Sequence, residues 1–321
     1  MAELTVAVVG CGGAGNVHLG CWANLSGARI AAVCDRDGVI VARTAMQYEG
    51  AAAFTEVGDL LASGPYDIVD VCTSSDQHFA VASEALRAGA NVLCEKPLAI
   101  APEEARTLVR LADERERLLM PAFCHRFHPP ILFAKELLEN DDLGKPVMFR
   151  CRFSGFLPDA EQREPAEGAA VGTGALLDTA IHGIDLFRYL VGEVASISGK
   201  LTTVNPALTI EDTAALLLQA ETGALGVVET SWSTPGGRNV VEIYGSAGAC
   251  LVDYDDGTLR YRTADEPVWR RRDESGLNRF EREIAHFADA VRGLQSLAVT
   301  GEDGARAVEL CAEVYRQNGR T

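Results

Sequence analysis

The chain has 321 residues, which is more than one ordinary hydrophobic core needs, so two domains are expected. Its 46 acidic and 29 basic residues give a formal net charge of -17. No long basic block interrupts this acidic excess, so nucleic acid and anionic membranes are not expected as partners. The longest basic run, residues 270–272, precedes two acidic residues and predicts a solvated surface turn rather than a phosphate-binding patch.

The nine cysteines contain no Cys-x-x-Cys pair, and several of them stand in apolar, strand-like runs. This usage indicates small buried residues in a reducing compartment. The N-terminus has no basic segment ahead of its apolar run, and no apolar run approaches the roughly 18 to 20 residues of a membrane span. We therefore expect a cytoplasmic protein.

Up to about residue 122, apolar runs of strand length alternate with helix-length segments, a pattern typical of a parallel sheet covered by helices. The expected strands are residues 5–9, 30–34, 68–72, 91–94 and 118–123. The expected helices are residues 15–25, 39–48, 77–88 and 102–117. Right-handed crossovers make this a doubly wound α/β fold, and residues 1–122 are predicted to form one domain.

Residues 123–321 are predicted to form a second, α+β domain, whose last helix could pack back on the first domain. Its expected strands are residues 147–153, 195–203, 212–219, 225–232, 240–244 and 250–254. Its expected helices are residues 131–139, 175–190, 280–292 and 303–317. These elements favour a large, mostly antiparallel open sheet with helices on one face. The polar stretch 158–174 is either a surface excursion or a flap over the ligand cleft.

A glycine-rich loop follows the first expected strand. It reads Gly10, Cys11, Gly12, Gly13, Ala14, Gly15, which fits G-x-G-x-x-G. In such a loop the first glycine makes a tight turn, the second lets the main chain approach a pyrophosphate, and the third lets the helix pack against the strand. The helix N-terminus adds N–H groups and a dipole that favour the anion. The loop therefore predicts a dinucleotide cofactor.

Asp35 stands at the end of the second expected strand, twenty residues after Gly15. Its carboxylate can accept hydrogen bonds from both ribose hydroxyls and would repel a 2'-phosphate, which favours NAD over NADP. Arg36 beside it could pair with a phosphate or stack on adenine. The alternative is that the two residues only cap the next helix.

Polar residues also follow the third expected strand, at the edge of a parallel sheet where ligands bind. They are expected to line the cofactor, with the histidine in a supporting role: Thr73, Ser74, Ser75 and His78.

Glu95, Lys96 and Pro97 follow the fourth expected strand, residues 91–94. Glu95 and Lys96 are expected at the cofactor, and the peptide bond before Pro97 could be cis. A partly desolvated lysine near a cationic nicotinamide would have a pKa below its usual ~10.4, which suits an acid/base group. The alternative is an ordinary surface lysine.

Asp178 and His182 are four residues apart in a helix-like segment, so both should project from one face, where the carboxylate can orient the imidazole. The alternatives are an ordinary helix-surface contact and a metal pair, although no third ligand stands at a suitable spacing. Cys124, His125 and His128 also resemble metal ligands, but loop residues that shape a pocket are favoured. No metal site is expected.

These motifs, in this order, resemble the Gfo/Idh/MocA family, named for glucose-fructose oxidoreductase, inositol dehydrogenase and a rhizopine-catabolism protein. The likeness covers nearly the whole chain and rests on residues 10–15, 73–78, 92–97, 125–129, 174–185, 211–213 and 287–290. The sequence departs from the family pattern at Ser74, where proline is usual, and at His125.

The resemblance implies a Rossmann domain, then an open sheet that makes a homodimer or homotetramer, and NAD(P)-dependent oxidation of sugars, cyclitols or related polyols. It assigns Lys96, Asp178 and His182 as the catalytic residues. We expect His182 to take the hydroxyl proton of a secondary alcohol as hydride passes to NAD, with Asp178 steadying the imidazolium and Lys96 bound to the same oxygen.

The substrate pocket is expected to include four further residues: Cys124, His125, Phe156 and Trp232. One alternative function is an NAD-dependent glycosidase that oxidises, eliminates and re-reduces. Another is a non-catalytic sugar- or NAD-sensing regulator, but regulators that resemble the family typically lack the lysine or the histidine.

Overall fold

The computed structural model describes residues 3–157, 174–274, 276 and 278–320. It divides the chain into two compact units, Met1–Cys124 with Asn278–Val308, and His125–Leu277 with Glu309–Thr321. The domains expected from the sequence, 1–122 and 123–321, stay a prediction. The polar stretch 158–174, expected to be either a surface excursion or a flap, lies outside the described residues, apart from Gly174.

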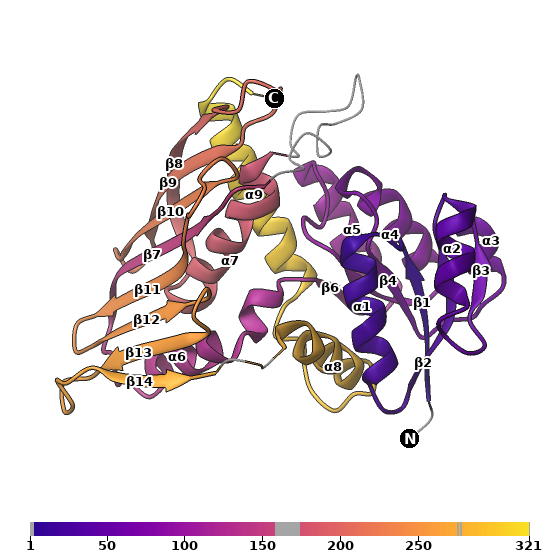
Figure 1. Ribbon diagram of the computed structural model, residues 1–321, viewed down its shortest axis with the longest axis horizontal. Coiled ribbons are helices and arrows are strands. Elements are labelled where there is room, and N and C mark those ends of the chain that lie inside the picture. Colours follow the sequence, from indigo (N-terminus) through magenta and orange to yellow (C-terminus); the bar gives the residue numbers. More distant parts are fainter. Residues whose placement is uncertain (1–2, 158–173, 275, 277, 321) are drawn as a thin grey trace. The chain divides into compact units, whose positions relative to one another are not determined.

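The first unit contains a six-stranded sheet in the order β3-β2-β1-β4-β5-β6, with every neighbouring pair parallel (Figure 1). The strands are β1 Leu4–Val9, β2 Ala28–Cys34, β3 Ala52–Phe54, β4 Ile68–Val71, β5 Asn91–Cys94 and β6 Leu119–Pro121. The central strands are apolar and buried, as a sheet covered on both faces requires. The predicted doubly wound fold is confirmed.

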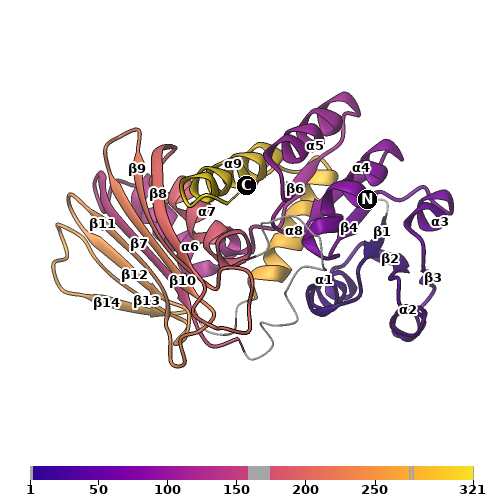
Figure 2. The same cartoon turned by 90° about the horizontal axis from the view of Figure 1, so that it is seen from above.

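Helices cover both faces of this sheet, with α1 and α8 on one face and α4 and α5 on the other (Figure 2). The unit's helices are α1 Gly13–Asn24, α2 Gly38–Ala45, α3 Val57–Ala62, α4 His78–Arg87, α5 Pro102–Glu114 and α8 Arg279–Val291. The last helix, α9 Gly301–Gln317, has residues in both units. Strands β1 and β4 pair in parallel although β2 and β3 lie between them in sequence. Their carboxyl ends are therefore side by side, where such folds bind ligands.

The second unit contains an eight-stranded sheet in the order β14-β13-β12-β11-β7-β10-β9-β8. The strands are β7 Pro146–Ser154, β8 Val194–Thr202, β9 Thr213–Ala220, β10 Leu225–Ser231, β11 Asn239–Gly245, β12 Ala249–Asp253, β13 Thr258–Arg262 and β14 Arg270–Asp273. Only β7 and β10 pair in parallel, so the predicted mostly antiparallel sheet is confirmed. The surface turn predicted at residues 270–272 is wrong, because this exposed run pairs with β13 as a charged edge strand.

One face of the large sheet is covered by helices of the same unit (Figures 1 and 2). Helix α6 Pro129–Glu139 packs against β12, and α7 Ile181–Leu190 packs against β7 and β10. A π-helical turn, Leu176–Ala180, precedes α7. The close approach depends on Gly183, where a Cβ atom would lie 2.6 Å from Cγ1 of Val228.

All nine cysteines are free and buried, as predicted. None of the helices in the described part of the chain combines the length and the apolar character that a bilayer span requires.

Candidate active site

Four loops meet at the carboxyl edge of the parallel sheet. Main-chain hydrogen bonds join the first residue of each loop to a neighbouring strand: Gly10 N to Cys34 O at 2.8 Å, Asp35 N to Phe54 O at 3.1 Å, Cys72 N to Val9 O at 2.7 Å, and Glu95 N to Val71 O at 2.8 Å. The cofactor residues expected from the sequence therefore lie along one edge of the first unit.

In the first loop, two glycines are tightly packed and two have open space around them. Gly10 has φ +98°, and a Cβ atom there would lie 2.4 Å from the Cys72 carbonyl oxygen; at Gly15 a Cβ atom would lie 1.9 Å from the Gly10 carbonyl oxygen. By contrast, exposed Gly12 and Gly13 have no other atom within 4 Å of such a Cβ position. Helix α1 begins here with no acidic residue in its first turn. The main chain thus fits a pyrophosphate at a helix N-terminus.

The Asp35 carboxylate is tied to this loop, since it accepts hydrogen bonds from Cys11 N at 2.8 Å and Asp37 N at 3.0 Å. Asp37 caps α2 by accepting from two main-chain N–H groups, so the alternative that Asp35 and Arg36 only cap the helix is wrong. Asp35 is half-buried and Arg36 is exposed. Burial, aided by the Asp35 charge, raises the pKa of the Cys11 thiol to about 11, so Cys11 is a neutral group beneath the loop.

In the next loop, Thr73 and His78 have different environments. The Thr73 hydroxyl is buried and has no hydrogen-bond partner in the described part of the chain. His78 is 1% exposed, with Nδ1 2.7 Å from the Pro97 carbonyl oxygen and Nε2 3.1 Å from the Thr73 carbonyl oxygen. Burial lowers the pKa of His78. His78 thus joins two loops, and its supporting role at the cofactor stays a prediction.

In the same loop, Ser74 is exposed and Ser75 is half-buried, so both residues reach the protein surface at the carboxyl edge of the sheet. Glu95 Oε2 accepts the main-chain N–H of Lys96 at 3.0 Å, and the Lys96–Pro97 peptide bond is cis. Lys96 is half-buried. Its part in catalysis stays a prediction.

In the second unit, the π-helical turn carries Asp178 and α7 carries His182. Such turns are frequent at functional sites. The Thr179 hydroxyl donates to Asp178 Oδ2 at 3.1 Å and accepts the indole N–H of Trp232 at 2.9 Å. Trp232, expected in the pocket, is thus joined to Asp178 through Thr179.

Aromatic and imidazole rings gather around His125, which contacts the ring of His182. The His125 ring lies 4.5 Å from the His182 ring and 4.7 Å from the Phe153 ring, centroid to centroid. Tyr254 lies 5.2 Å from His125 and stacks on His128 at 4.4 Å. We call these five residues the ring cluster. The sequence analysis did not select Phe153 or Tyr254, although strand alternation at β7 points Phe153 toward the helices.

Two other predicted pocket residues lie apart from this cluster. Phe156 is 62% exposed, and its main chain pairs with Ser233. Cys124 is buried, which raises the pKa of its thiol to about 12. Within the described residues, Cys124, His125 and His128 do not bring three ligand atoms close enough to share a metal ion.

A buried ion pair holds the ring cluster in place. The Arg126 guanidinium donates from Nε to Asp185 Oδ2 at 2.9 Å and from Nη2 to Oδ1 at 2.6 Å, with the side chains only 6% and 1% exposed. Arg126 belongs to the 3-10 turn Cys124–Phe127 and Asp185 to α7. This two-point clamp fixes the His125 turn against the His182 helix. The sequence shows both residues only as motif matches.

Glu211 organises the start of the Asp178 turn. Its Oε1 accepts the Tyr315 hydroxyl at 2.6 Å and Leu176 N at 3.3 Å, and its Oε2 pairs with Arg320 at 2.9 Å. At Gly174 a Cβ atom would lie 2.3 Å from this carboxylate, so only glycine fits.

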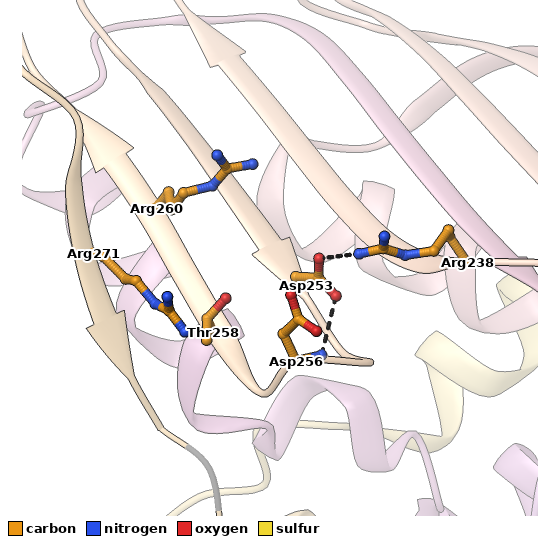
Figure 3. A pocket seen from close by; sticks show the side chains of 6 residues that line it. All are labelled: Arg238, Asp253, Asp256, Thr258, Arg260 and Arg271. Carbon is orange, nitrogen blue, oxygen red and sulfur yellow. Dashed lines mark hydrogen bonds and ion pairs between the residues drawn. The ribbon is translucent and has the colours of Figure 1, made fainter.

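A separate polar hollow opens on the large sheet (Figure 3). It is lined by Arg238, Asp253, Asp256, Thr258, Arg260 and Arg271. Arg238 pairs with Asp253, which also accepts Asp256 N at 3.2 Å. The hollow contains none of the predicted site residues.

Comparison with known proteins identifies both parts of the chain. Residues 4–123 match the family model "Oxidoreductase family, NAD-binding Rossmann fold", and residues 131–250 match "GFO/IDH/MocA C-terminal domain". A D-apiose dehydrogenase of Rhizobium rhizogenes is 31% identical, over 100% of this chain and 97% of that protein. An inositol 2-dehydrogenase of Mycolicibacterium gilvum is 28% identical, over 97% of this chain and 90% of that protein.

Among solved structures, an oxidoreductase from Agrobacterium radiobacter in complex with NAD+, L-tartaric acid and magnesium superimposes with a TM-score of 0.89. It is 25% identical and covers 99% of this chain and 98% of its own.

Proposed function

We propose a hydride transfer for this chain, which belongs to the GFO/IDH/MocA family of NAD-binding oxidoreductases: it oxidises a secondary alcohol of a sugar, cyclitol or related polyol. The proposal rests mainly on the carboxyl edge of the parallel sheet. There, the open main chain of Gly12 and Gly13 follows β1 and lies next to Asp35, and Lys96 follows β5, two strands from β1. The relatives named for acting on apiose and inositol support a polyhydroxy substrate.

NAD, when bound, accepts the hydride at its nicotinamide ring. In our proposal, His182 takes the hydroxyl proton, and Asp178 stabilises the imidazolium that results. Lys96 donates a hydrogen bond to the same substrate oxygen and stabilises its developing negative charge. The Trp232–Thr179–Asp178 chain limits the movement of the carboxylate.

The ring cluster is our candidate for substrate recognition. Its faces can cover the C–H side of a cyclic polyol, and the imidazoles of His125 and His128 and the Tyr254 hydroxyl can bond hydroxyl groups. A pocket lined by the ring cluster would exclude water and orient the reacting carbon of the substrate.

We also propose that the chain forms a homo-oligomer through the uncovered face of the large sheet. Leu225, Met148 and Tyr244 are register partners across β10, β7 and β11, and their side chains are 42%, 49% and 39% exposed. A contiguous exposed apolar row is typical of a protein interface. Light scattering of the wild type and of Met148→Lys tests this, because a monomeric wild type rejects it.

We also propose a cytoplasmic location, because a reducing cytoplasm suits the free cysteines.

A substrate screen tests the proposed function. Purified protein is mixed with NAD or NADP and with branched pentoses, inositols, aldoses, aminosugars or sugar acids, and reduced nicotinamide is followed by absorbance. Reduction of NAD by at least one polyol supports the proposal. Release of an aglycone from a glycoside with no net reduced cofactor identifies the glycosidase, and NAD binding without either reaction identifies a regulator.

A further inference from the structure

The first unit contains a buried cluster of titratable groups that the proposed reaction does not use. Its members come from α1, from the ends of β4 and β5, and from α8: His18, Asp70, Cys72, Glu95 and Glu283. The side chains of His18, Asp70 and Glu283 are wholly buried. Buried charges are costly unless they are paired, so their arrangement beside the Glu95–Lys96 turn calls for an explanation.

His18 lies between two carboxylates. Its Nδ1 is 2.9 Å from Asp70 Oδ2, and its Nε2 is 3.3 Å from Glu95 Oε1, the second being an ion-pair contact rather than a well-aligned hydrogen bond. A neutral imidazole carries only one N–H, so one carboxylate would face a lone pair. Burial alone lowers the pKa of His18, but Asp70 and Cys72 raise it well above its ordinary value. The position between two carboxylates and the raised pKa both favour the imidazolium form of His18.

Asp70 anchors one end of this arrangement. Its Oδ2 also accepts the indole N–H of Trp22 at 2.7 Å, and its Oδ1 is 3.4 Å from the Cys72 thiol. The polar atoms of His18, Asp70 and Cys72 lie within 4.8 Å of one another, but these hydrogen bonds occupy them, so we assign them to a proton-linked cluster and not to a metal. At the other end, Glu95 Oε2 accepts the main-chain N–H of Lys96.

Glu283 behaves differently from the other two carboxyls. Neither of its oxygens has a hydrogen-bond partner in the described part of the chain. Burial raises its pKa well above the ordinary value, and the Glu95 and Asp70 charges act in the same direction, against His18 and Arg279. The nearby Cys21 thiol is neutral because burial raises its pKa to about 11. Glu283 is thus a neutral acid beside a charged chain.

We propose that His18, anchored by Asp70, is a positioning residue that holds the Glu95 carboxylate against the main chain of Lys96 and so directs the Lys96 side chain. This inference rests on the proposed function, because it takes Lys96 as a group that meets the substrate. His18 acts through Glu95 and does not itself contact the substrate.

Two matched variants of the full chain separate positioning from folding. In His18→Asn, the side-chain amide can take the place of the imidazole Nδ1 and bond Asp70, but it is too short to reach Glu95. In His18→Gln, the longer side-chain amide can take the place of Nε2 and bond Glu95. We expect His18→Asn to lower kcat on the order of ten- to a hundredfold, with the Kd for NAD unchanged. The acid limb of its pH profile should move to higher pH, because Glu95 loses the positive neighbour that favours its ionised form. His18→Gln should recover most of kcat.

A second pair of variants, at Glu95 and Glu283, tests the same proposal if the His18 variants do not fold. Glu95→Gln removes a working charge and should reproduce the loss of kcat, whereas Glu283→Gln replaces one neutral group by another and should leave kcat and its pH profile unchanged. Equal activity losses in His18→Asn and His18→Gln with an unmoved pH profile, or equal effects of Glu95→Gln and Glu283→Gln, would overturn the proposal.

A measurement without turnover keeps this inference apart from the proposed function. Nitrogen NMR of histidine-labelled protein should show both ring nitrogens of His18 protonated at neutral pH, and Glu95→Gln should let the proton leave at lower pH. A neutral His18 in the wild type rejects the positioning chain whatever the activity. An imidazolium in a protein that oxidises no polyol rejects the proposed function instead.

Discussion

The two units build their functional residues by different means. In the first unit the main chain makes the shape: Gly10 turns, Gly15 packs, and Gly12 and Gly13 leave space. In the second unit side chains make it, since the Arg126–Asp185 pair holds His125 beside His182. A main-chain site depends on a few contiguous positions, whereas a side-chain site depends on contacts distributed over the fold. Substitutions should therefore separate binding in the first unit from positioning in the second.

The largest effect is expected at Lys96, the residue of the first unit that the proposed reaction assigns to the substrate hydroxyl. Lys96→Met should lower kcat by about 10²- to 10⁴-fold, because a hydrogen-bond donor to the reacting oxygen is lost. The Kd for NAD, measured by calorimetry, should stay within twofold, or about 0.4 kcal/mol, of the wild type. Lys200→Met, at an exposed position, is the control. Unchanged turnover in Lys96→Met would remove Lys96 from the mechanism.

The clamp of the second unit should dominate its stability. Arg126→Leu removes the guanidinium that holds the buried Asp185 carboxylate at two points, which should lower the free energy of unfolding by about 3–5 kcal/mol. The double variant with Asp185→Leu should recover part of that loss. Arg150→Ala breaks a pair whose side chains are 43% and 31% exposed and should cost only about 0–1 kcal/mol. Urea unfolding measures all of these, and equal losses in Arg126→Leu and Arg150→Ala would contradict the clamp.

The main-chain site can be probed without disturbing the fold. Gly12→Ala puts a methyl group into space that no described residue occupies, so stability should hold while the Kd for NAD rises about ten- to a hundredfold, or ~1.4–2.8 kcal/mol. Gly20→Ala in the same helix is the matched control. It should leave the Kd unchanged and add about 0.5–1 kcal/mol of stability. An unchanged Kd in Gly12→Ala would show that the pyrophosphate does not approach this loop.

The contrast between main-chain features and side-chain contacts also explains how much of the fold and the site can be predicted from the sequence. The parallel sheet and the glycine loop are predictable because apolar runs and glycine spacing are local. β3 is apolar but only three residues long, and β14 is a run of charged residues, so neither has an apolar run of strand length. Asp178 and His182 are readable from their spacing, but Arg126 and its partner are 59 residues apart. Such contacts arise from packing, which one sequence does not reveal.

The smallest effect is expected in cofactor choice. Asp35→Asn keeps an acceptor for the Cys11 N–H but removes the charge that repels a 2'-phosphate. The ratio of kcat/KM for NAD to that for NADP should fall about tenfold, which is ~1.4 kcal/mol. An unchanged ratio would mean that Asp35 only supports the loop.

The central claim is that an amine, an imidazole and a carboxylate serve one substrate hydroxyl. The most direct test is a crystal structure of the chain with NAD and the best substrate from the screen. We predict that Lys96 Nζ and a ring nitrogen of His182 both lie about 3 Å from the same hydroxyl oxygen. A hydroxyl oxygen at the nicotinamide that only one of these groups contacts, or neither, would contradict the account.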